Sequence, residues 1–138
     1  MSYVTDGAAP ELSADAFVRG ERRREISLAE FRGSWAVVAF AARSTDVLEL
    51  AALEEAFAAD GAIVLAATPD DWHEVAQRYA DEPVRFPILA EVAEERRVTL
   101  IVDPLGVVRH VGLRRSARET LAVLEELVSS PVAAQLAA

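Results

Sequence analysis

Residues 35–55 read WAVVAFAARSTDVLELAALEE, and the rest of the chain is organised around this stretch. Residues 35–40 are apolar, as expected for a central strand that is covered on both faces. The turn that follows, residues 42–46, contains Ser, Thr and Asp, which are good helix caps. Over residues 46–59 apolar side chains recur at intervals of three and four, which predicts a helix closed by Gly61. A strand-to-helix turn of this kind is where α/β proteins hold reactive groups, because the first N–H groups of the helix face outward.

The segments on either side complete an α/β pattern. Residues 62–67 (AIVLAA) read as a second buried strand and residues 71–80 as a second helix, an order that predicts parallel strands with right-handed crossovers. Upstream, residues 16–18 and 22–26 predict a small hairpin, and Ser27 with Glu30 forms a capping box. Downstream, residues 97–102 and 107–112 predict antiparallel strands, and residues 116–129 a closing helix. We therefore expect one domain over residues 1–138, with loose tails at residues 1–8 and 131–138.

Composition excludes several classes of function. The formal net charge is −9, the opposite sign from a surface that binds phosphates, so no nucleic-acid partner is expected. The apolar runs are far shorter than the roughly 20 residues that span a membrane, so we expect no membrane partner either. The N-terminus lacks the basic start and apolar core of a signal peptide, which favours a cytoplasmic location. The bias toward Ala, Arg, Val and Glu suggests a bacterial source.

The chain contains no cysteine, which excludes disulfides, thiolate chemistry and thiolate metal sites. Its two histidines, His73 and His110, fall in different predicted elements, so we expect no metal site and no cofactor. His73 follows two aspartates and a tryptophan and is a candidate general acid or base, although a surface histidine is the more common outcome. His110 stands at a position that we interpret as structural.

Several segments resemble the peroxiredoxins, the AhpC/TSA family. These are ISLAEFRGSWAVVAF at residues 26–40, the Phe86–Leu89 segment FPIL, and RVTLIVDPLG at residues 97–106. The resemblance implies a thioredoxin-like fold, with a central mixed β-sheet flanked by helices and an N-terminal β-hairpin. Residues 90–96 stand where the family has a further helix, so we expect this shorter segment to do its work. The resemblance also implies a homodimer, paired through the turn–helix face or along the sheet edge.

The catalytic turn of the family reads F-x-P-x-x-x-T-x-x-C, where the Cys reduces peroxide and the Thr helps to position it. We match Thr45 to the Thr, which puts Ala41 at the Pro and Leu48 at the Cys. A leucine cannot act as the nucleophile, so the resemblance implies a member without thiol peroxidase activity. Arg97 matches the arginine that orients the peroxide in the family, although a shift by one residue would select Arg96 instead.

The sequence thus predicts a small pocket in which Thr45 and Arg97 meet beside Ala41 and Leu48. A hydroxyl and a guanidinium could hold an oxygen-rich ligand there. The alternative is that Thr45 is only a helix cap and that Arg97 is a surface cation paired with Glu94 or Glu95. Glu49 is a further candidate acid or base next to the pocket, although a solvated glutamate in the first turns of a helix is more common.

Three functional hypotheses follow. The first is a peroxiredoxin-like protein that binds a small organic or oxyanionic ligand, or a protein partner, in the former active-site pocket. The second is a recruited non-redox enzyme of a bacterial biosynthetic pathway, with acid–base or isomerase-type chemistry. The third is a purely structural subunit of a dimer.

Overall fold

One seven-stranded mixed sheet forms the centre of the molecule, in the order β2-β1-β5-β4-β3-β6-β7. The computed structural model describes residues 3–113 and 116–130. Along the chain, the elements are β1 (Ser13–Val18), β2 (Glu21–Ser27), the 3-10 helix η1 (Leu28–Phe31), β3 (Trp35–Ala39), α1 (Ser44–Ala52), α2 (Glu54–Ala59), β4 (Ala62–Ala67), α3 (Trp72–Tyr79), β5 (Ile88–Leu89), β6 (Val98–Val102), β7 (Val108–Leu113) and α4 (Ala117–Val128).

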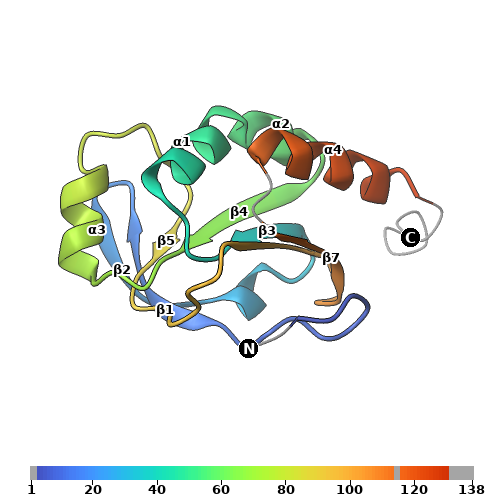
Figure 1. Ribbon diagram of the computed structural model, residues 1–138, viewed down its shortest axis with the longest axis horizontal. Coiled ribbons are helices and arrows are strands. Elements are labelled where there is room, and N and C mark those ends of the chain that lie inside the picture. The colour runs from blue at the N-terminus through green and yellow to red at the C-terminus, as the bar shows by residue number, and fades with distance from the viewer. Residues whose placement is uncertain (1–2, 114–115, 131–138) are drawn as a thin grey trace.

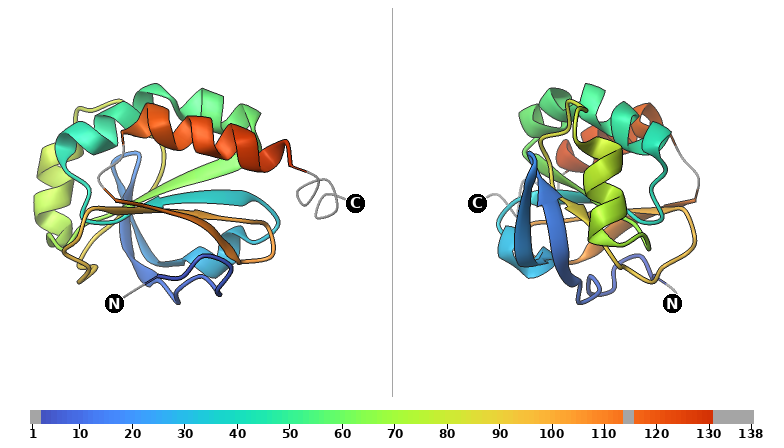
Figure 2. Two further views of the ribbon diagram at one scale, coloured as in Figure 1. Left: turned by 45° about the vertical axis from the view of Figure 1, so that its right-hand side comes forward. Right: turned by 90° about the vertical axis from the view of Figure 1, so that its left-hand side faces the viewer.

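Strand β3 is buried along its whole length, as the apolar run predicts. It pairs in parallel with β4 and antiparallel with β6. Its side chains alternate between two cores, because successive residues of a strand point to opposite faces of the sheet. Val37 belongs to the core under the helices, whereas Val38 belongs to the core on the other face. Figures 1 and 2 show α1, α2 and α4 over one face, and η1 with the N-terminal segment against the other.

The predicted hairpin, the parallel pair and the capping box of Ser27 and Glu30 are confirmed. The hairpin β1–β2 is longer than predicted, and the two-residue strand β5 joins it to the sheet by pairing with both β1 and β4. The carboxylate of Glu30 accepts from the Ser27 N–H at 2.8 Å, and Glu119 accepts from the Ser116 N–H at 3.2 Å. Asp71 caps α3 by accepting from the Glu74 N–H at 2.9 Å.

Two predictions about helices are wrong. The single helix over residues 46–59 is instead two helices, because Leu53 leaves the helical conformation (φ −108°, ψ 8°) between α1 and α2. Helix α1 also begins earlier, at Ser44, because the Asp46 carboxylate accepts from the Arg43 N–H and lies in the first turn. Residues 90–96 form no helix; they are an irregular segment, in which Val92 donates its N–H to the carbonyl of Thr68.

Residues 3–8, assigned from the sequence to a loose tail, lie against the β6–β7 turn. The Asp6 N–H donates to the Val108 carbonyl at 2.7 Å, and Ala8 forms a β-bridge with Val107. The Ala9 N–H donates to the Gly106 carbonyl at 2.8 Å. These backbone bonds supply the partners that a free tail would lack. The other predicted tail, residues 131–138, lies outside the described residues.

A buried aspartate organises this turn. The side chain of Asp103 is fully buried and accepts from the N–H groups of Leu105 (2.9 Å) and Val107 (3.0 Å) and from Arg109 Nε (2.8 Å). Arg109 also donates to Asp6 at 2.8 Å, which ties the N-terminal segment to the same turn. The hydrogen bond to Asp103 raises the pKa of Arg109 above its ordinary value, so the guanidinium stays charged.

Replacing Asp103 with alanine should lower the free energy of unfolding by about 3 kcal/mol, because three donors lose their shared acceptor in a buried place. Urea denaturation measures this change. Asp6→Ala is the matched control: its side chain is 72% exposed, so its loss should cost less than about 1 kcal/mol. Equal losses for the two variants would contradict a structural role for the buried carboxylate.

Candidate functional site

The candidate site lies at the turn between β3 and α1, next to the start of the neighbouring strand β6. The register of β3 and β6 pairs Ala39 with Thr99, so Arg97, two residues before Thr99, lies beside the turn. Ala41 in this turn has a left-handed backbone (φ 50°), which costs a residue with a Cβ about 1 kcal/mol. Such strain is often found at functional turns.

An ion pair occupies the centre of the site. Arg97 donates from Nε to Asp46 Oδ2 at 3.1 Å and from a terminal nitrogen to Oδ1 at 2.5 Å. The two side chains are only 26% and 21% exposed. Two parallel bonds between a guanidinium and a carboxylate form a strong and directional pair. The Arg43 N–H donates to the same carboxylate at 2.9 Å, so Asp46 is held from two sides.

The ion pair leaves little free space. The cavity beside it measures about 20 Å³, room for about one water molecule. It is lined by residues of the turn, α1, β6 and α4: Ala39, Phe40, Ala42, Asp46, Glu49, Leu50, Arg97, Thr99, Ala117 and Thr120. The site as folded is therefore a closed, charged contact and not an open ligand pocket.

The structure brings together only some of the predicted site residues. Arg97 and Glu49 both line the cavity. Thr45 is exposed and lies outside the lining, and Leu48 is 36% exposed in a separate surface depression. Ala41 is also absent from the lining, next to Ala42, which belongs to it.

The other two candidates lie away from the cavity. His73 is exposed on α3. Its ring packs edge to face against the Trp72 ring, with the two ring centroids 5.5 Å apart. Arg96 pairs with Glu94 at 2.9 Å, and this hydrogen bond holds the pKa of Glu94 below its usual value. Arg97 is thus the arginine of the site. The residues that the structure describes contain no group of three or more His, Asp or Glu able to hold a metal ion.

Asp46 is the residue of the candidate site that the sequence reasoning missed. The family motif can be counted from Phe40 instead of Thr45, and its Thr position then falls on Asp46 and its Cys position on Glu49. This count agrees with the geometry, since both residues line the cavity with Arg97. The backbone at Ala41 points the same way, because a proline cannot adopt a φ of 50°. The signal was present in the sequence as the Phe that opens the motif.

Solved structures with a similar fold include the following proteins. The mitochondrial 2-Cys peroxiredoxin of Plasmodium falciparum matches with a TM-score of 0.80 at 15% identity, covering 91% of this chain and 94% of that chain. Enterococcus faecalis AhpC matches with a TM-score of 0.80 at 18% identity, covering 93% and 95%. Thioredoxin peroxidase I of Plasmodium yoelii matches with a TM-score of 0.78 at 17% identity, covering 90% of each chain.

These likenesses define the class: a thioredoxin-like fold of the peroxiredoxin type, with a mixed seven-stranded sheet flanked by helices. The model of the AhpC/TSA family matches residues 6–111, so the chain belongs to the AhpC/TSA family, as a divergent member without cysteine. A search of curated protein sequences found no match. Among the described residues, none of the helices is long and apolar enough to cross a membrane.

The new count of the motif can be tested by placing a thiol at each position. Glu49→Cys combined with Asp46→Thr should give a thiol that faces an unpaired Arg97, which lowers the thiol pKa. Its alkylation by iodoacetamide at mildly acidic pH should be roughly tenfold faster than that of Leu48→Cys in the same background, as a pKa lower by about one unit predicts.

Glu49→Cys alone is the second control, because Asp46 still neutralises Arg97 there and the thiol should react slowly. Equal rates for the thiols at positions 48 and 49 would contradict the new count.

Proposed function

We propose that this protein is a member of the AhpC/TSA family without peroxidase activity, and that it acts by binding a partner chain beside the former catalytic turn. The observation that carries the proposal is the Asp46–Arg97 ion pair. A guanidinium that would orient peroxide is bound by a carboxylate of its own chain. The position of the nucleophile, counted from Phe40, carries Glu49, and the chain has no thiol to replace it.

The closed cavity argues against a small ligand at this place. Small-molecule sites enclose about 300–1,000 Å³, whereas the cavity here measures about 20 Å³. An oxyanion would also have to displace Asp46 from Arg97. The recruited-enzyme hypothesis meets the same obstacle, because Glu49 lines a cavity with no room for an organic substrate. A protein partner can bind to the surface beside the turn and does not need an open cavity.

The surface next to the turn offers a contact area for a partner. A shallow depression of about 520 Å³ surrounds Leu48, which is 36% exposed. Its lining combines apolar residues with charges of both signs: Leu48, Ala51, Ala52, Glu54, Glu55, Glu82, Pro83 and Arg85. A two-fold copy can bring Arg85 of one chain against the acidic residues of the other, since an isologous interface pairs unlike residues of the same patch. A second copy of this chain is therefore the partner that we propose.

The loss of peroxidase activity has a direct test. With excess dithiothreitol, the purified chain should consume hydrogen peroxide no faster than the reductant alone, because it lacks a reactive thiol. The remaining peroxide can be followed colorimetrically, with a cysteine-containing peroxiredoxin as the positive control. Consumption that rises with protein concentration and saturates with peroxide would overturn this part of the proposal.

The dimer has a separate test. Leu48→Asp should weaken self-association by at least about tenfold in Kd, because the interface would have to bury a carboxylate. Analytical ultracentrifugation over a concentration series measures the Kd. Leu113→Asp is the matched control, since Leu113 is 66% exposed at the end of the edge strand β7. A monomeric wild type, or a dimer that only Leu113→Asp disrupts, would contradict pairing through the Leu48 surface.

A further inference from the structure

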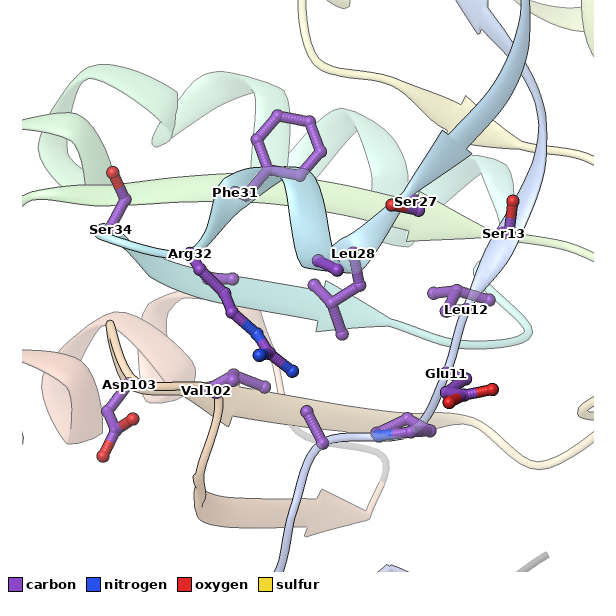
Figure 3. A pocket seen from close by; sticks show the side chains of 15 residues that line it. Glu11, Leu12, Ser13, Ser27, Leu28, Phe31, Arg32, Ser34, Val102 and Asp103 are labelled. Atoms are coloured by element: carbon purple, nitrogen blue, oxygen red, sulfur yellow. The ribbon is translucent and has the colours of Figure 1, made fainter.

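A second cavity lies on the opposite face of the sheet from α1, α2 and α4. It is a groove of about 540 Å³ between η1 and the segment that leads into β1, with β3 and β6 as its floor (Figure 3). This volume falls within the range of about 300–1,000 Å³ that is typical of small-molecule sites. None of the residues proposed for the former catalytic turn lines it.

The walls of the groove are largely apolar. Leu12, Leu28, Phe31, Ala36 and Val102 line it from the N-terminal segment, η1, β3 and β6. Backbone bonds hold its two sides together: the Leu28 N–H donates to the Leu12 carbonyl at 2.9 Å, and the Gly33 N–H donates to the Pro104 carbonyl at 2.9 Å. The groove is thus a preformed feature of the fold, and apolar groups can be buried in it.

Arg32 brings a positive charge without an ion-pair partner into this groove. Six arginines of the described chain form ion pairs (Arg22, Arg24, Arg78, Arg96, Arg97 and Arg109), whereas Arg19, Arg23, Arg43, Arg85 and Arg118, like Arg32, form none there. Within the same part of the chain, Arg32 forms no salt bridge, although the full sequence contains 23 acidic residues. Its Nε lies 3.0 Å from where a Cβ would stand on Gly106, so the guanidinium rests against the β6–β7 turn.

Glu11 brings the opposite charge to the same groove. It lines the cavity and forms no ion pair with any described residue, Arg32 included. Figure 3 shows the two charged side chains at separate places along the groove. The third charged residue of the lining, Asp103, is already saturated by the N–H groups of Leu105, Val107 and Arg109. The groove therefore presents one available cation and one available anion with apolar walls between them.

We propose that this groove binds a short apolar peptide with free termini, its carboxylate on Arg32 and its ammonium on Glu11. A guanidinium prefers a carboxylate, which it can bind through two parallel hydrogen bonds. Separated opposite charges complement a zwitterion whose termini are held apart by apolar residues. Ser13 and Ser34 are further polar residues of the lining.

The test uses Leu-Leu and Leu-Ala-Leu as probes, each also as its C-terminal amide and its N-acetyl derivative. Amide signals of the ¹⁵N-labelled chain should shift at Leu28, Gly33 and Ala9 when the free peptides are added. Amidation and acetylation should each weaken binding by about tenfold or more, because each removes one charge-assisted hydrogen bond. No shift at these amides with either free peptide at millimolar concentration overturns the proposal.

Two variants assign each charge to its residue. Arg32→Met should bind the free peptide and its amide equally, because this variant has no guanidinium to tell a carboxylate from an amide. Glu11→Gln should likewise bind the free peptide and its N-acetyl derivative with equal affinity, because this variant has no carboxylate to pair with the ammonium. Arg23→Met is the matched control, since Arg23 is an exposed arginine of β2 outside the groove, and it should leave every affinity unchanged. If amidation weakens binding to Arg32→Met as much as to the wild type, the assignment is overturned.

The proposal for the groove and the proposal for the former catalytic turn are tested independently. Peptide binding is read on one face of the sheet, while peroxide consumption and self-association concern the other. A result against either proposal leaves the other as it was.

Discussion

Burial of β3 on both faces is the constraint on which the rest of the structure depends. Each face of the strand needs a cover, and the helices supply one while η1 and the N-terminal segment supply the other. Its two edges are paired with β4 and β6, and the pairing of Ala39 with Thr99 puts the start of β6 next to the β3–α1 turn. The position of Arg97 at the candidate site is thus a consequence of strand register.

The Asp46–Arg97 ion pair joins two distant parts of the chain at the candidate site. The Asp46 carboxylate pairs with the Arg97 guanidinium. The same carboxylate accepts from the Arg43 N–H and so helps to start α1. The ion pair therefore contributes to the local structure of the turn. The energetic reason is general: a partly buried guanidinium without an anion is costly, and an internal carboxylate offsets part of that cost.

The two faces of the sheet therefore differ in what they offer. The helical face carries a closed ion pair and an exposed leucine, Leu48. The opposite face carries an open groove, in which Arg32 and Glu11 have no ion-pair partner within the described residues. The groove exists because the N-terminal segment is held in place by Asp6, Arg109 and the buried carboxylate of Asp103. One wall of the groove and the stability of the β6–β7 turn thus share a single network.

The sequence by itself determined the elements whose signals are local: the buried run of β3, the parallel unit with β4, the capping box of Ser27 and Glu30 and the left-handed turn at Gly61. It also determined that thiol chemistry is absent. Only the tertiary structure decided that Asp46 and not Thr45 meets Arg97, because the two side chains are 51 residues apart and meet only through strand register. The break at Leu53, the absence of a helix over residues 90–96 and the groove at Arg32 were likewise decided by packing between distant segments, which no local pattern encodes.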